Sequence, residues 1–191
     1  MRSLAIVRRE VLACRICEAS LPHGPRPVFQ LHASARILIA SQAPGRRVHL
    51  TGVPFDDPSG IRLREWMGVS RETFYDPRKV AILPMGFCYP GSGPNGDAPP
   101  RVECAPVWRD ALLSHLPRLE LVLVVGRYAQ VYHLPDGGRS VTENVRAWRA
   151  LWPNRIPLPH PSPRNQMWVQ RNLWFAREVL PALRCRVREL T

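Results

Sequence analysis

Several features that would assign the protein to other classes are missing from the sequence. No apolar run approaches the length of a membrane-spanning helix, and we see no internal repeat. The stretch 4–13 is interrupted by Arg8, Arg9 and Glu10, so it is typical of an amphipathic helix and not of a signal peptide. We therefore expect a cytoplasmic protein that does not contact a membrane.

A linker long enough to separate two domains is also missing. The 191 residues suit one domain with a single core. Apolar residues make up 45% of the chain, which is enough to form that core and argues against disorder. We therefore expect one domain over residues 1–191.

Lysine is almost absent, yet the chain is strongly basic. Lys79 is the only lysine among 27 basic residues, and with 15 acidic residues the formal net charge is +12. An excess of this size favours a polyanionic partner, most often nucleic acid. A genome rich in G and C would also enrich arginine, alanine and proline, so the charge alone leaves both interpretations open.

Cysteines are few, but four of the five are grouped. Cys14 and Cys17 form a C-x-x-C pair, Cys88 and Cys104 lie sixteen positions apart, and Cys185 stands alone. In a cytoplasmic chain this pattern favours a metal or cluster over disulfides, because a cluster needs four thiolates. Scattered buried cysteines are the alternative.

The apolar pattern predicts an α/β fold. Short apolar runs bounded by turn residues predict strands over 36–41, 80–84, 121–125 and 156–159, the last a short or edge strand because of its prolines. Helical spacing of apolar residues predicts helices over 59–67, 103–116, 142–152 and 165–180. The alternation indicates a single-domain three-layer α/β/α sandwich around a central, mainly parallel four-stranded sheet. The segment 88–101 is rich in proline and glycine and has neither period, so we expect a functional or mobile loop.

Residues capable of chemistry follow the predicted strands. Ligands of parallel sheets bind beyond the carboxyl ends of the strands. There Phe55 could stack on a planar ring, and Asp56 or Asp57 could deprotonate a water. His160 could stabilise charge on a leaving group, and Arg164 could hold a phosphate. The alternatives are that Phe55 belongs to the core and that Asp57 only caps a helix.

The same segments carry a resemblance to a known family. Ala43-Pro44-Gly45 follows the first predicted strand, Gly-Val-Pro-Phe stands at 52–55, and His-Pro-Ser stands at 160–162. Together with the order of the four cysteines, these motifs resemble the uracil-DNA glycosylase superfamily, and specifically its bacterial and archaeal family-four and family-five branches. The resemblance spans about 14–180, and no single motif is specific, but five in order are.

This resemblance implies a DNA repair glycosylase that flips uracil, or a related deaminated base, out of DNA and hydrolyses its bond to the sugar. It implies that Phe55 stacks on the base, that His160 bonds uracil O2 and that Asp57 activates water. Further base contacts are implied around Gln42, Ala43, Pro44 and Gly45. A loop that enters the minor groove is implied at Pro161, Ser162, Pro163, Arg164 and Asn165.

The resemblance also implies that Cys14, Cys17, Cys88 and Cys104 bind a structural 4Fe–4S cluster, with zinc as the alternative; the chemistry itself needs no cofactor. It implies DNA containing uracil or deaminated bases as the partner and action as a monomer.

The sequence departs from the family pattern at the position that reads the base. Relatives place an asparagine four residues before the third cysteine, where this chain has Pro84. Backbone groups near Met85 or the side chain of Asn95 are the candidates to replace it. Three other functions stay open: a glycosylase for deaminated purines, a non-catalytic module that binds uracil or abasic DNA, and a redox-sensing cluster protein.

Overall fold

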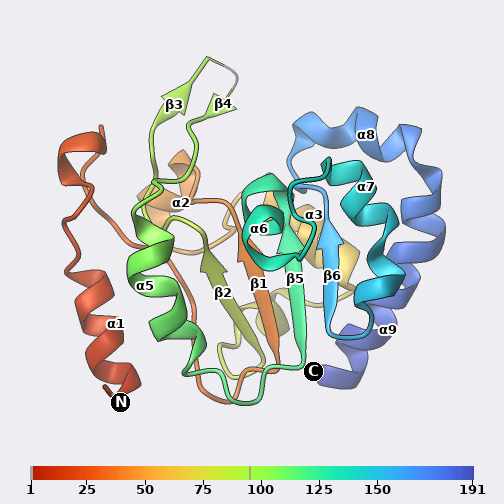
Figure 1. Ribbon diagram of the computed structural model, residues 1–191, viewed down its shortest axis with the longest axis horizontal. Helices are drawn as coiled ribbons and strands as arrows, with labels where there is room; N and C mark the ends of the chain where they lie inside the picture. The colour runs from red at the N-terminus through yellow and green to blue at the C-terminus, as the bar shows by residue number, and fades with distance from the viewer. Residues whose placement is uncertain (1, 95) are drawn as a thin grey trace.

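The computed structural model describes residues 2–94 and 96–191, and its centre is a parallel four-stranded sheet (Figure 1). The strand order is β2 (Val80–Pro84), β1 (Ile37–Ser41), β5 (Leu121–Val125) and β6 (Arg155–Leu158). All three pairings are parallel. The predicted strands are therefore confirmed to within a residue or two, and the proline-containing β6 lies at an edge, as expected.

Helices cover both faces of the sheet, which confirms the three-layer prediction. Alternate strand residues point to opposite faces. Ile37 and Ile39 pack in one cluster with residues of α3 (Pro58–Met67) and α9 (Leu180–Leu190). Leu38 packs on the other side with residues of α1 (Leu4–Leu12) and α5 (Cys104–Leu113). Burial on both faces explains why the strands are almost continuously apolar.

Several short elements were not predicted. They are the helices α2 (Arg46–Thr51), α4 (Arg71–Tyr75) and α6 (Gly126–His133), and the two-residue strands β3 (Ser92–Gly93) and β4 (Gly96–Asp97). The last two pair antiparallel, so the segment 88–101 contains a small hairpin where the sequence indicated only a loop. The predicted helix over 142–152 is α7 (Val141–Arg146) followed by a 3-10 turn over Trp148–Leu151.

The prediction of one helix over 165–180 was wrong. A 3-10 turn over Pro163–Asn165 leads into α8 (Gln166–Arg171), which ends at Asn172. The side chain of Asn172 donates back to the carbonyl of Trp168 at 2.8 Å and competes with continued helical bonding. The chain then resumes in a π-helical turn over Phe175–Val179 that continues into α9.

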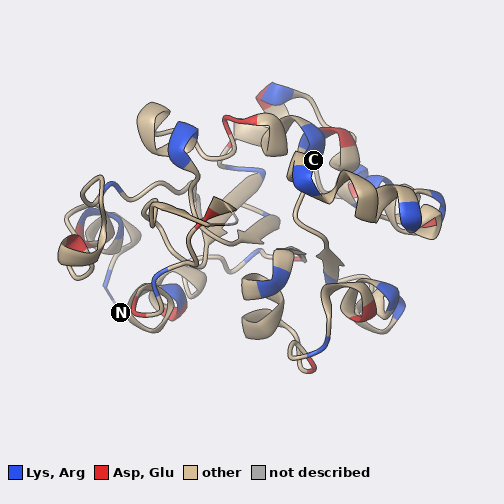
Figure 2. Cartoon of the chain, turned by 90° about the horizontal axis from the view of Figure 1, so that it is seen from above, with Lys and Arg blue, Asp and Glu red and all other residues tan. Residues whose placement is uncertain are grey.

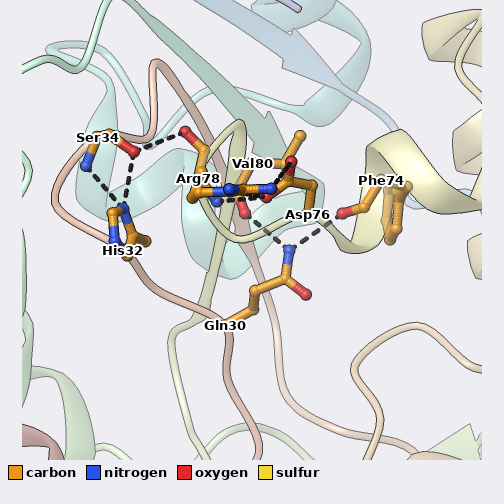
Figure 3. Close-up of polar contacts among 7 residues, drawn as sticks. All are labelled: Gln30, His32, Ser34, Phe74, Asp76, Arg78 and Val80. Atoms are coloured by element: carbon orange, nitrogen blue, oxygen red, sulfur yellow. Dashed lines mark hydrogen bonds and ion pairs between the residues drawn. The ribbon is translucent and has the colours of Figure 1, made fainter.

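The open edge of β2 is covered by the segment that precedes β1. Gln30 pairs with Ile82 through two backbone hydrogen bonds, and its side-chain amide donates to the carbonyls of Phe74 and Val80 (Figure 3). Beside it, Ser34 donates to the carbonyl of Arg78 at 3.1 Å. These bonds satisfy an edge that would otherwise expose unpaired backbone groups.

The carboxyl ends of the four strands meet at one edge of the sheet. The β3–β4 hairpin and α8 stand above this edge, separated from one another (Figure 1). Across the described residues, no helix is long and apolar enough to span a membrane. The fold therefore leaves the carboxyl edge as the place where the sequence-predicted loops converge.

Candidate active site

A cavity of about 200 Å³ lies at this edge of the sheet. Three loops that the sequence singled out meet in it: the turn after β1, the segment before α3 and the loop after β6. The predicted residues that line it are Ala43, Pro44, Gly45, Phe55, Asp57, His160, Ser162 and Arg164. A second hollow adjoins it and is lined by Gln42 and Asn165, among others.

His160 is held as a neutral hydrogen-bond donor. The backbone N–H of Ser162 donates to its Nδ1 at 3.2 Å, so in the neutral ring the proton is on Nε2. Burial lowers the pKa of His160 to about 4, which keeps the ring neutral at physiological pH. A neutral imidazole in a desolvated wall can donate to an oxygen on which negative charge develops.

The loop that carries His160 is braced from both sides. Asn165 donates from its side-chain amide to the carbonyl of His160 at 2.8 Å. From α3, Arg62 donates to the carbonyl of Ser162 at 3.2 Å and to the side chain of Gln166 at 2.8 Å. The ring therefore keeps a fixed place on the wall of the cavity.

Asp57 is both a helix cap and a cavity residue. Its Oδ1 accepts the N–H of Gly60 at 2.8 Å and so caps α3. Burial raises the pKa of its carboxyl, while hydrogen bonds from Gly60 and Ser59 and the charge of Arg47 oppose that rise. The neighbouring Asp56 instead pairs with Arg71 at 3.5 Å. Asp57 therefore caps α3 and also lines the cavity, so the cap does not exclude a functional role.

Phe55 sits at a strained backbone position on the cavity wall. Its φ of 56° lies in the left-handed region, which a bulky residue rarely adopts. The side chain is 8% exposed and meets Phe74 edge to face, with centroids 6.1 Å apart. A Cβ on Gly60 would stand 1.8 Å from the carbonyl oxygen of Phe55, so only glycine fits there. Strain of this kind persists where the surroundings enforce it, often at functional sites.

Met85, the predicted base contact, is not among the residues that line the two hollows. Its N–H donates to the carbonyl of Ser41 at 2.9 Å, and its side chain packs with Ala40 and Val124. Pro84 does line the cavity, but its carbonyl accepts from Arg109 at 3.1 Å. Asn95, the other candidate for this role, lies outside the described residues.

The loop residues predicted to contact DNA divide into two groups. Ser162 and Arg164 line both hollows, and Asn165 lines the second. Pro161 and Pro163 line neither hollow, and they shape the turn on the two sides of Ser162. The side chain of Arg164 reaches the β3–β4 hairpin at Gly96. A Cβ built on Gly96 would overlap the guanidinium of Arg164.

Sequence reasoning missed one charged residue of the cavity. Asp97, at the end of β4, lines both hollows. Its only sequence signal was the position of its segment between Cys88 and Cys104. Nothing in a proline- and glycine-rich segment reveals which of its side chains folds back onto a sheet edge.

The four grouped cysteines line one further pocket, whereas Cys185 is exposed in α9. The indole of Trp108 donates to Sγ of Cys14 at 3.4 Å, and the N–H of Phe87 donates to Sγ of Cys104 at 3.4 Å. Burial and the neighbouring thiols raise the pKa of Cys88 to about 11 and that of Cys104 to about 12. The donor set fits an iron–sulfur cluster, which four thiolates hold. Within residues 2–94 and 96–191, no three His, Cys, Asp or Glu side chains form a group that could hold a metal ion.

Basic residues lie on many parts of the molecule, including the start of α2 (Figure 2). Seen from above, Lys and Arg lie on many elements (Figure 2). Arg46 and Arg47 are exposed at the start of α2, directly after the turn that lines the cavity. Exposed arginines of this kind can contact phosphates.

A comparison with a family model confirms the resemblance that the sequence motifs indicated. The model of the Uracil DNA glycosylase superfamily matches residues 29–184, which covers most of the sequence and all three cavity loops. Members of this family are DNA glycosylases and bind DNA as their substrate. The chain belongs to the uracil-DNA glycosylase superfamily.

Proposed function

We propose that the protein is a DNA repair glycosylase that hydrolyses the N-glycosidic bond of uracil, or of a related deaminated base, and leaves an abasic site. The observation that carries the proposal is the cavity in which Phe55, Asp57 and a neutral His160 meet. A base must be flipped out of the duplex to reach such a cavity.

Each wall residue has one part in this reaction. Phe55 stacks on the flipped base, and Nε2–H of His160 donates to a base oxygen as negative charge develops on the leaving group. Asp57 accepts a proton from the water that attacks the sugar. The loop of Ser162 and Arg164 occupies the gap that the base leaves in the duplex.

The residues of the cavity do not by themselves select uracil over other deaminated bases. At the position where relatives have an asparagine, Pro84 offers no side-chain donor, and its carbonyl is engaged by Arg109. A glycosylase for deaminated purines is therefore the second candidate, because hypoxanthine and xanthine also present a base oxygen to His160. A module that only binds uracil or abasic DNA predicts the same affinity with and without Asp57.

The test is a strand-cleavage assay. An oligonucleotide with one uracil, hypoxanthine or xanthine is incubated with the protein and then treated with alkali, which breaks abasic sites. We expect cleavage at the uracil, and its loss in His160→Ala. Cleavage only at a purine lesion would select the second candidate, and binding without cleavage of any oligonucleotide would select the module.

We further propose that Cys14, Cys17, Cys88 and Cys104 hold a structural 4Fe–4S cluster, with zinc as the alternative. The support is that these four thiols line one pocket. Zinc would require them to move closer together, since among the described residues no three such side chains now form a group that could hold a metal ion. The group would supply no chemistry at the base cavity; it would fix the ends of the hairpin segment. Iron, sulfide and zinc analysis of freshly purified protein distinguishes the two, and folded protein without any of them would contradict both.

A further inference from the structure

The β3–β4 hairpin contributes to the cavity a carboxylate that has no role in the reaction as proposed above. Asp97 ends β4 and lines both the base cavity and the hollow beside it. It comes from the segment between Cys88 and Cys104, far in sequence from the loops of Asp57 and His160. The hairpin thus closes one side of the cavity with an acidic group.

Gly45 lies between two carboxylates on the cavity wall. A Cβ built on Gly45 would stand 3.2 Å from Oδ2 of Asp97 and 4.0 Å from Oδ2 of Asp57. The backbone of Gly45, at φ −82° and ψ 174°, is one that any residue adopts. Backbone conformation therefore does not demand glycine here, and the distinctive feature is that a side chain would crowd the carboxylate of Asp97.

The oxygen of Asp57 nearest to Gly45 is not the one that accepts the capping N–H of Gly60. Oδ1 of Asp57 accepts the capping N–H, and Oδ2 is the oxygen nearest to Gly45. A water bound there by Asp57 alone would have one O–H directed and the other free to rotate. A second acceptor would fix both O–H groups and leave a lone pair facing the cavity.

We propose that Asp97 is a second catalytic carboxylate, which holds the attacking water together with Asp57 in the space beside Gly45. This inference rests on the proposed glycosylase function and adds a residue to it. It also gives the hairpin a part in the reaction, as the element that brings the second acceptor to the water.

The step balances without a further reactant. The bond between the sugar C1′ and the base nitrogen breaks, and its electron pair leaves with the base, whose oxygen is held by His160. The water oxygen forms the new bond to C1′, and one water proton passes to Oδ2 of Asp57. The released base takes a proton from solvent, and Asp57 returns its own to solvent.

The experiment compares single-turnover rates of base release for wild type, Asp57→Asn, Asp97→Asn and the double variant, on whichever base the wild type excises. We expect Asp97→Asn to lower the rate about 100-fold, the lower end of what positioned acid–base groups contribute. Affinity for DNA with a stable abasic analogue should stay within about twofold. Asp136→Asn, a surface carboxylate paired with Arg139, is the matched control and should keep the wild-type rate.

The double variant shows whether the two carboxylates share one water. If they do, its rate should be close to that of the more damaged single variant, because residues that act as a unit are not additive. Losses that multiply would overturn the shared water. Gly45→Ala places a methyl group against Oδ2 of Asp97 and so tests the position of that carboxylate, and an unchanged rate would also overturn the proposal.

Failure of this inference and failure of the proposed function give different results. A wild type that excises a base while Asp97→Asn keeps its rate would reject only the role of Asp97. A wild type that excises none of uracil, hypoxanthine or xanthine would reject both.

Discussion

The N–H of Ser162 donates to Nδ1 of His160, and this single hydrogen bond decides which side of the imidazole carries the proton. With Nδ1 occupied, the neutral ring can donate only from Nε2. The donor is therefore set by the backbone of its own loop before any substrate binds.

Replacement of His160 should lower the rate of base release and leave the affinity for DNA almost unchanged. We expect His160→Ala to lower the single-turnover rate of base release by about 100- to 1,000-fold, the usual loss for one donor at a developing oxyanion. Affinity for abasic DNA should change little, because the loop remains braced by Arg62. Equal losses in rate and in affinity would show instead that His160 organises the loop.

Stability should decrease on acidification because of the buried imidazoles. The pKa of His160 is about 4 in the folded protein and that of His133 about 3, against an ordinary value of 6.5. The unfolded chain therefore binds protons between these values that the folded chain does not. We expect the two histidines to make their whole contribution to the free energy of unfolding above pH 6.5. This contribution should decrease as the pH drops toward 4. Urea denaturation at several pH values measures this, and His160→Gln should flatten the slope.

The two neighbouring aspartates should differ sharply in activity. Asp57→Asn should slow base release by about 100-fold or more, since the amide no longer accepts a proton. Asp56→Asn should keep at least half of the rate, because Asp56 only pairs with Arg71 near the surface. Steady-state and single-turnover assays compare the two, and a greater loss in Asp56→Asn would place the reacting carboxylate one residue earlier.

Gly60 should tolerate no side chain. The Cβ of Gly60→Ala would collide with the carbonyl of Phe55, so we expect a loss of about 1–3 kcal/mol in the free energy of unfolding and a displaced Phe55. Gly138→Ala is the control, because a Cβ there meets nothing within 4 Å. Denaturation midpoints and base-release rates of both variants check this; wild-type values for Gly60→Ala would mean that the turn can open.

Much of the fold was readable from the sequence, because its signals are local. Strands buried on both faces appear as continuous apolar runs, and the longer helices repeat apolar residues at helical spacing. The helices α2, α4 and α6 have only five to eight residues and too few turns for a period. The break at Asn172 depends on one side chain that bonds to its own backbone, which no period reveals.

The candidate site was predictable only where a loop follows a strand. Parallel strands bring their carboxyl ends to one edge, so Gly45, Asp57 and His160 could be placed together. Asp97 reaches the same cavity through the docking of a hairpin, and the N–H of Met85 bonds to the carbonyl of Ser41. Both outcomes depend on tertiary contacts between segments distant in sequence.

The pocket that holds Cys88 and Cys104 has a consequence for how tightly the protein can bind DNA. The hairpin between these cysteines is a loop whose two ends already lie on one pocket wall. A loop whose ends are held close together has less conformational freedom to lose when a ligand orders it. Asp97 and the glycine against which Arg164 packs are both carried by this loop. The hairpin at the rim of the cavity is therefore already ordered when DNA binds. Ordering this hairpin then lowers the affinity for DNA by less.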